Sequence, residues 1–149
     1  RGLGDVYKRQ TIACLKTNLI HIRAFVSESL KEIALRTTDL NLIVLAIDEV
    51  CANLIIHSNA CDERNQLSIV CEYDKETCDL LVAIKDKGSA FDYENYAEPQ
   101  LHDIIEHKGK GGIGLLLVRK IMDDVTYTSH GEFNLTRLTK RINPASLKS

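Results

Sequence analysis

Three polar residues, Glu49, Asn53 and His57, recur every four positions along an otherwise apolar stretch. In a helix this spacing places all three side chains on one face. Carboxylate and amide oxygens, completed by water and phosphate oxygens, suit a hard cation such as Mg²⁺. The competing interpretation is a polar stripe that meets solvent at the edge of a buried helix.

A second polar group comes directly after an apolar run that ends at Asp86. Gly88, Phe91 and Asp92 follow it within six residues. A carboxylate at the end of a strand can accept a hydrogen bond from the amino group of a ligand. Gly88 lets the backbone approach a neighbour closely, or turn with a positive φ. An ordinary Asp-x-Gly turn would have the same sequence.

The third group consists of four glycines within six residues, Gly109, Gly111, Gly112 and Gly114, just before a helical run that starts at Leu115. Exposed backbone N–H groups and the positive end of a helix make a phosphate site. The segment lacks the GK[ST] of a Walker A loop. No strand immediately precedes it, as a dinucleotide fingerprint would require. A flexible linker is the alternative.

Helices and hairpins must position these groups. Apolar residues at gaps of three and four predict helices over 19–35, 40–56 and 115–122, with Asp39 as the N-cap of the second. Alternating or β-rich runs predict two antiparallel hairpins, formed by 67–73 with 79–86 and by 125–129 with 134–141. Helices and hairpins in separate blocks predict an α+β fold with the helices on one face of a mostly antiparallel sheet. The polar segment 87–110 is long for a loop, which is typical of functional loops.

The two ends of the chain are expected to contribute little to the folded domain. Residues 1–10 show no helical or strand period, so we expect a leader or a truncated upstream segment outside the fold. Residues 143–149 are expected to be a frayed tail. The domain is therefore predicted to span 11–142.

Composition narrows the class of protein. The chain has 149 residues, enough for one domain, and a net charge of −2, which does not favour nucleic-acid binding. Its longest apolar runs are expected to be far shorter than the ~20 residues of a membrane span. Five cysteines without a CxxC pair indicate reduced thiols in a cytoplasmic protein rather than disulfides or a zinc cage.

Taken in order, the three groups resemble the GHKL ATPase superfamily, which includes histidine kinases, Hsp90, gyrase and MutL. The likeness covers residues 19–142. The segments DEVCANLIIHSN and GGIGLLLVRKIMDDVTY look most like the anti-sigma-factor serine kinases and related single-domain bacterial regulators. The resemblance implies the Bergerat-type ATP-binding fold, a two-layer sandwich.

The resemblance also implies a role for each group. Glu49 would activate the hydroxyl that attacks the γ-phosphate of ATP, Asn53 would bind Mg²⁺, and Asp86 would read adenine beside Gly88. His57 would lie near the nucleotide or serve packing.

The remaining residues that the resemblance assigns to the nucleotide are Phe91 of the second group and the four glycines of the third. Gly109, Gly111, Gly112 and Gly114 would wrap the phosphates, and the helix of Leu115 would offer its N-terminus. Ser89 and Ala90 follow Gly88 where the family commonly has proline.

The implied function is an ATP-binding regulator that phosphorylates a serine of a small antagonist protein and also binds a sigma factor or comparable target. A homodimer formed through the N-terminal helix and neighbouring strand is a further expectation. Two alternatives stay open, a non-catalytic ATP-gated binding module and an orphan catalytic domain of a sensor histidine kinase. His21 lacks the acidic neighbours of a phosphoacceptor histidine, which disfavours histidine autophosphorylation.

Overall fold

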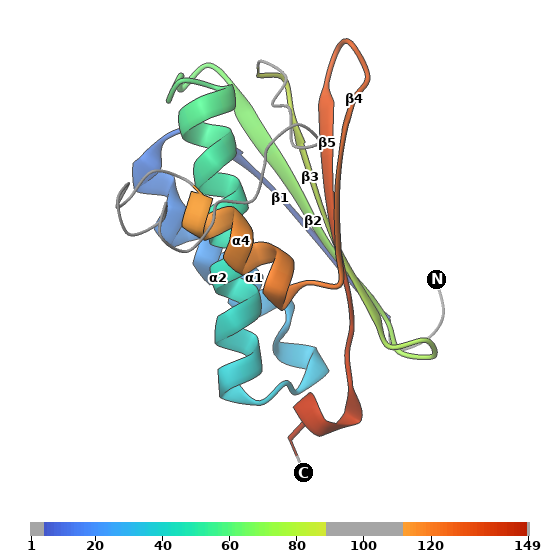
Figure 1. The fold of residues 1–149 in the computed structure, drawn as a ribbon. Helices are drawn as coiled ribbons and strands as arrows, with labels where there is room; N and C mark the ends of the chain where they lie inside the picture. The colour runs from blue at the N-terminus through green and yellow to red at the C-terminus, as the bar shows by residue number, and fades with distance from the viewer. Residues whose placement is uncertain (1–4, 89–111, 149) are drawn as a thin grey trace.

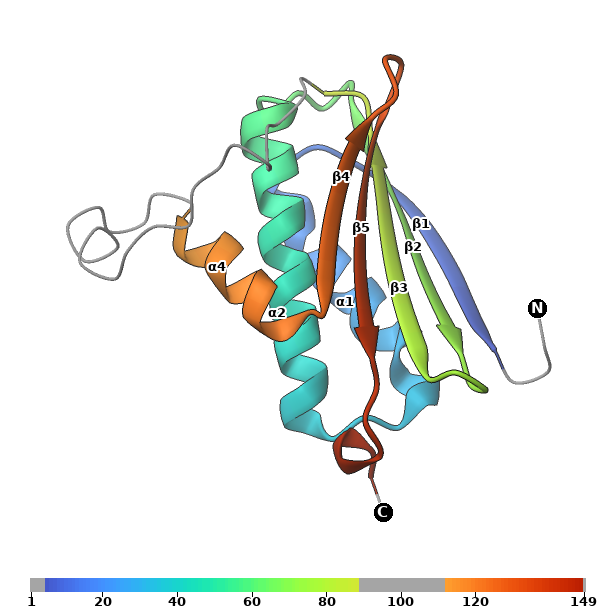
Figure 2. The same ribbon diagram turned by 45° about the vertical axis from the view of Figure 1, so that its right-hand side comes forward.

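The computed structural model describes residues 5–88 and 112–148. In this part of the chain, five antiparallel strands form one sheet in the order β1-β2-β3-β5-β4. The helices α1, α2 and α4 cover one face of it and leave the other face without a helix (Figures 1 and 2). The predicted α+β architecture is confirmed. The strands are β1 (Val6–Ala13), β2 (Gln66–Asp74), β3 (Asp79–Asp86), β4 (Asp124–Ser129) and β5 (Asn134–Arg141), and the helices are α1 (Leu19–Ser29), α2 (Thr37–Asn53) and α4 (Gly112–Ile121).

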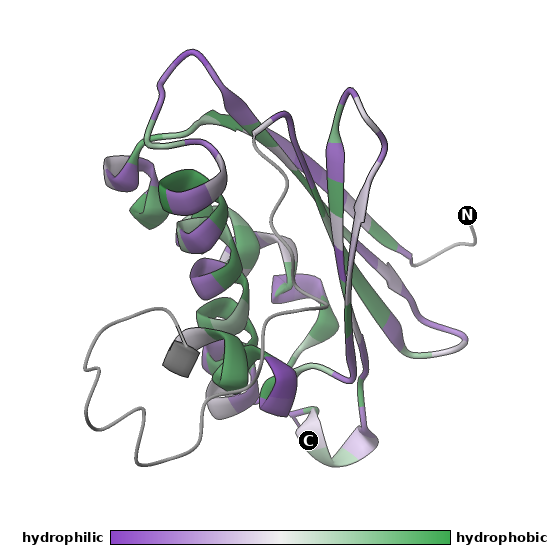
Figure 3. Ribbon diagram, turned by 45° about the horizontal axis from the view of Figure 1, so that its top comes forward, coloured by the Kyte–Doolittle hydropathy of each residue, from purple (hydrophilic) through white to green (hydrophobic). Residues whose placement is uncertain are grey.

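The core is one cluster of buried apolar residues from the helices and the sheet. Figure 3 shows hydrophobic segments in both layers. Every second residue of β2 and β3 is buried there, as the period of a strand requires. Ile43, Ile47 and Val50 of α2 are fully buried against them. All five cysteines are free, and three of them lie in this core.

Residues 6–10 belong to the fold, so the prediction that residues 1–10 stay outside it is wrong for them. They form most of β1, which pairs antiparallel with β2 from Val6↔Tyr73 to Ala13↔Gln66. β1 is an edge strand, and only Val6 of its eight residues is buried. Its pairing rests on backbone hydrogen bonds, so no alternation of apolar residues marks it in the sequence.

The helices differ from prediction at their ends. The first ends at Ser29 rather than near residue 35, because Lys31–Ile33 form a 3₁₀ turn that Ala34 closes with φ of 60°. The second begins at Thr37, so Asp39 lies in its first turn and is not its N-cap. A carboxylate in the first turn still interacts favourably with the helix dipole, which explains why it resembles a start signal.

The C-terminal tail is anchored, contrary to the expectation that residues 143–149 fray. Leu147 forms a β-bridge with Leu35. The backbone N–H of Lys148 donates to the carbonyl of Ala34 at 2.8 Å. The tail therefore closes over the connection between α1 and α2, where apolar periodicity gives no signal.

One helical segment contradicts the expectation that every apolar run is too short to span a membrane. Thr37–Ser58, with a mean hydropathy of 1.7, is long and apolar enough by length and composition. No other helix within residues 5–88 and 112–148 passes this test. In the fold this segment packs against α1 and α4 and shares the hydrophobic core with the sheet, and the core helix of a folded domain passes the same test.

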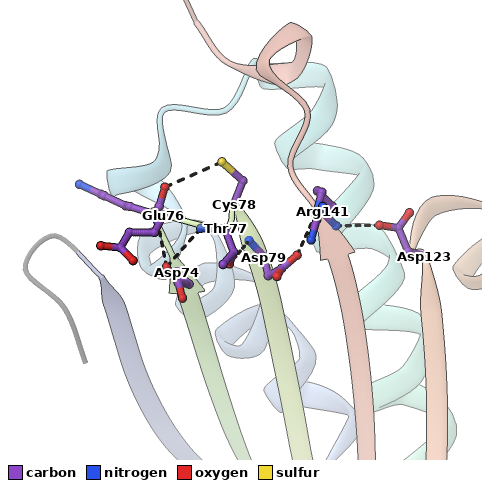
Figure 4. A network of polar contacts seen from close by, with 8 residues as sticks. Asp74, Glu76, Thr77, Cys78, Asp79, Asp123 and Arg141 are labelled. Atoms are coloured by element: carbon purple, nitrogen blue, oxygen red, sulfur yellow. Dashed lines mark hydrogen bonds and ion pairs between the residues drawn. The ribbon is translucent and has the colours of Figure 1, made fainter.

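The end of the sheet at the β2–β3 turn is closed by a network of polar contacts (Figure 4). Asp74 accepts from the backbone N–H of Glu76 at 2.8 Å, and Arg141 donates to Asp79 at 3.1 Å. The backbone N–H of Arg141 donates to Asp123 at 2.7 Å. Acidic side chains thus gather at this end of the sheet.

Candidate functional site

Asp86 ends β3 as a buried carboxylate, only 1% exposed. Its Oδ2 accepts from the backbone N–H of Gly88 at 3.0 Å, from Asn59 Nδ2 at 3.1 Å and from Asn134 Nδ2 at 3.4 Å. Its Oδ1 is also buried and has no partner among the described residues. A buried oxygen without a donor is unfavourable, so this atom is suited to accept a hydrogen bond from a ligand.

Asn59 and Asn134 hold this carboxylate, and sequence reasoning missed both of them. The side chain of Asn59 also donates to the carbonyl of Leu54 at 2.8 Å, and that of Asn134 to the carbonyl of Gly88 at 2.9 Å. Because both amides bind the Oδ2 side, Oδ1 stays free. Asn134 can be recognised as a partner of Asp86 only from the strand register, which places the two residues opposite each other.

Two further buried side-chain oxygens in the described chain lack partners, and both lie next to the residues that hold Asp86. One is the hydroxyl of Ser58, the residue before Asn59. The other is the hydroxyl of Thr136, two residues after Asn134 on β5. Residues two apart in a strand share a face. A hydroxyl can both donate and accept. Unsatisfied hydrogen-bonding capacity is therefore concentrated around this end of β3 and β5, as a site for a polar ligand requires.

Gly88 lets the chain turn directly against the end of the helical layer. A Cβ at this position would overlap the carbonyl oxygen of Ser58 and lie 2.7 Å from Asn59 Cγ. Its φ is not in the left-handed region. Of the two reasons expected for a glycine here, close approach is the one that the structure shows.

Glu49 lies half-buried on α2, beside the first turn of α4. A Cβ added to Gly114 would overlap Glu49 Oε2 and lie 3.0 Å from its Cδ. Burial, and to a lesser degree the neighbouring Asp48 carboxylate, raise the pKa of Glu49. The contact between α2 and α4 thus brings a proton-accepting group to the glycine-rich start of a helix.

Asn53 is the last residue of α2, one turn after Glu49, and is half-buried. A π-helical segment, Leu54–Ser58, then widens the helix, with the N–H of Asn59 donating to the carbonyl of Leu54 at 3.0 Å. This wider turn takes the exposed His57 off the straight stripe that regular α-helical spacing predicts.

Only part of the second polar group, which starts at Asp86, and of the glycine-rich third group lies within the described residues. Phe91, Gly109 and Gly111 lie outside the described residues. Gly112 begins α4, three residues before the predicted start at Leu115. The side chain of Leu115 is buried, only 2% exposed. Only its backbone is therefore available for the predicted contact with the phosphates. The assigned site residues stay predictions.

Substituting the two described glycines should have unequal effects on stability. Gly88→Ala would push a methyl group into backbone, and we expect it to lower the free energy of unfolding by about 1–3 kcal/mol. Gly114→Ala would meet only the end of a flexible carboxylate side chain and gain helix propensity, so the change should stay below about 1 kcal/mol. Urea denaturation of both variants checks this. Equal losses would contradict the packing described for Gly88.

Comparison with known proteins found one matching protein family and several similar proteins. The model of the histidine kinase-like ATPase domain matches residues 12–140. The serine-protein kinase RsbW of Bacillus subtilis is 25% identical over 103 residues, 66% of this chain and 62% of the relative. RsbW of Staphylococcus aureus is 31% identical over 104 residues, 65% of this chain and 64% of the relative. The match thus spans less than two thirds of the length of these relatives.

Two solved structures are similar in fold. One holds the RsbU and RsbW domains of a Mycobacterium tuberculosis protein, with a TM-score of 0.66 and 18% identity over 96% of this chain and 34% of that chain. The other is the SiaB–SiaC complex of Pseudomonas aeruginosa, with a TM-score of 0.62 and 11% identity over 89% of this chain and 88% of that chain. The family match runs from the end of β1 to the last but one residue of β5, and the chain belongs to the histidine kinase-like ATPase domain family.

Proposed function

We propose that this chain binds Mg-ATP and transfers the γ-phosphoryl group to a serine of a partner protein. The observation that carries the proposal is the contact between Glu49 and Gly114, which sets a carboxylate of raised pKa at the N-terminal turn of α4. A proton acceptor beside a helix start that can hold phosphate is the arrangement that phosphoryl transfer to a hydroxyl needs.

Asp86 supports the choice of an adenine nucleotide. Its free, buried Oδ1 accepts one hydrogen bond, which the exocyclic amino group of adenine donates. Asn59 and Asn134 fix the carboxylate so that this oxygen is the one presented. The unpartnered hydroxyls of Ser58 and Thr136 offer further hydrogen bonds to the ring or to a bridging water.

The phosphates and the metal ion would be held mainly by backbone and by one amide. The first turn of α4, from Gly112, offers N–H groups that have no intrahelical partner. Asn53 would bind Mg²⁺ through its amide oxygen. No cluster of three His, Cys, Asp or Glu side chains suited to a metal occurs within the described ranges. Mg²⁺ commonly keeps water and substrate phosphates as most of its ligands, so a single protein ligand fits it.

Glu49 would accept the proton of the attacking serine hydroxyl. When bound, Mg-ATP supplies the activated phosphoryl group and neutralises charge on it. Because burial raises its pKa, the Glu49 carboxylate is a stronger base than an exposed glutamate. The names of the two curated relatives, both serine-protein kinases, support serine as the acceptor.

The partner is proposed to be a bacterial regulator, a small antagonist protein that carries the serine, with a sigma factor or comparable target as a second partner. One similar structure is a complex of two proteins, which supports a protein partner. A cytoplasmic location follows from the need for ATP and agrees with the free thiols. We further propose a homodimer.

The test is phosphoryl transfer from γ-labelled ATP to proteins that co-purify with the chain. We expect an acid-stable label on a serine of the partner. An acid-labile label on the chain itself would indicate histidine phosphorylation and overturn the proposal. ATP binding that changes partner affinity without any transfer of label would instead establish the ATP-gated binding module.

A further inference from the structure

A cavity of about 350 Å³ is lined by residues of β1, β2 and β3 and by residues that flank β2 and β3. Its charged lining consists of four cationic side chains, Arg9, Arg64, Lys85 and Lys87, and of the acidic residue Asp86. Thr11 and Ser68 add hydroxyl groups between them. Arg9, Thr11, Ser68 and Lys85 lie on the less buried face of their strands, so this part of the cavity is on the opposite side of the sheet from Glu49.

The strand register explains why these side chains meet. Thr11 pairs with Ser68, and Ser68 pairs with Lys85, so the three form one row across the sheet. Arg9, two residues before Thr11, shares its face. Along β3 successive side chains alternate, so the buried carboxylate of Asp86 turns toward the helical layer while the exposed Lys85 turns outward.

The positive charges that line this cavity are only partly neutralised by acidic side chains. Arg64 is paired with Asp62 at 2.8 Å and lowers the pKa of that carboxyl to about 2. Lys85 Nζ lies 4.2 Å from the ring centroid of Phe133, which holds the ammonium group in place without neutralising it. For Arg9, Lys85 and Lys87, no carboxylate partner occurs in the described chain.

Asp86 is the one acidic residue among those that line the cavity, and its side chain is only 1% exposed. The pair Asp74↔Asp79 lies six residues along the strands from Ser68↔Lys85, which corresponds to roughly 20 Å. Like charges on neighbouring strands repel one another. An anion in the cavity would relieve the repulsion among the four cationic lining groups, Arg9, Arg64, Lys85 and Lys87.

We propose that this cavity is a binding site for a phosphate group, separate from the nucleotide site. Its lining supplies the donors that phosphate oxygens require, namely guanidinium, ammonium and hydroxyl groups. Its volume is at the small end of ligand pockets, which suits a compact oxyanion. The inference does not depend on the proposed kinase activity, because the cationic groups that carry it lie on the other face of the sheet from Glu49.

Calorimetric titration of the whole chain with pyrophosphate tests the proposal. We expect the double variant R9Q/K85Q to bind pyrophosphate at least roughly tenfold more weakly than the original chain, since it loses two charge-assisted contacts. Lys75→Gln, in the exposed β2–β3 turn at the other end of the sheet, is the control and should bind as before. ATP affinity should be unchanged in the double variant, which also reports that it is folded.

Two outcomes would overturn the proposal. One is equal pyrophosphate affinity in the original chain and R9Q/K85Q. The other is equal loss of pyrophosphate and ATP affinity in that variant, which would place the anion in the nucleotide site. Amide shifts of Thr11 and Ser68 on titration would support the outer cavity. Parallel titrations with inorganic phosphate and a phosphoserine peptide then distinguish a free phosphate from a phosphoprotein as the source, by which of them binds more tightly.

Discussion

Glu49→Gln is expected to reduce the rate of phosphoryl transfer by about 10²–10⁴-fold, the range that a general base contributes. The amide has nearly the same shape as the carboxylate but cannot accept the serine proton. Affinity for ATP should change little, because the base acts on the attacking hydroxyl and not on the bound nucleotide. A single-turnover assay with γ-labelled ATP, together with calorimetric titration of ATP, measures the two quantities separately.

Asp48→Asn is the matched control for this variant. Asp48 is the adjacent carboxylate, and Arg23 of α1 pairs with it at 2.9 Å. Its charge contributes to the raised pKa of Glu49, so its loss should lower that pKa slightly and leave most of the transfer rate. If Glu49→Gln transfers phosphate at the original rate, the base lies elsewhere.

The raised pKa of Glu49 also sets the direction of the pH dependence. The base works only when deprotonated, so transfer should fall as the pH drops through the pKa of Glu49. Because burial raises this pKa, the fall should begin at a higher pH than for an exposed glutamate. Asp48→Asn should move this acidic limb to lower pH, which a purely structural role for Glu49 would not produce.

Asp86→Asn is expected to weaken ATP binding by about 1–3 kcal/mol, or roughly 5- to 150-fold. Three donors converge on Asp86 Oδ2, from Asn59, Gly88 and Asn134. An amide can satisfy them with its oxygen only by turning its NH₂ group toward the ligand, where it would face the amino group of adenine. If the amide turned the other way, its NH₂ group, itself a donor, would point at the three donors, and none of them would have an acceptor.

Calorimetric titration of Asp86→Asn with ATP checks this prediction, with Asp79→Asn as the control. Asp79 begins the same strand at its far end, where it is exposed and pairs with Arg141. Its substitution should leave ATP affinity unchanged. Undiminished affinity in Asp86→Asn would remove this residue from the nucleotide site.

Much of the architecture could be predicted from the sequence because local patterns decide it. β3 has the predicted bounds, Asp79–Asp86, since its residues alternate between a buried and a more exposed face. The buried helix around Ile47 was recognisable because it is apolar on nearly every side. The family was recognisable from the order of three short groups, which the match over residues 12–140 confirms.

Other features depend on contacts between segments distant in the chain. β1 is an edge strand held by backbone pairing, and the tail bridges from Leu147 to Leu35 across the fold, so neither follows a local apolar period. Asn134 reaches Asp86 across the β3–β5 register, 48 residues away. No spacing within one segment indicates such a partner.

The sequence by itself thus determined which residue types are present for chemistry, including Glu49 and Asp86, and which helices and strands carry them. Only the tertiary structure decided which oxygen of Asp86 is free, because that depends on amides from two other segments. It also decided that Glu49 faces Gly114, because the packing of α2 against α4 sets that distance. The physical reason is that hydrophobic periodicity is a local property of the chain, whereas hydrogen-bond satisfaction and close packing are properties of neighbours in space.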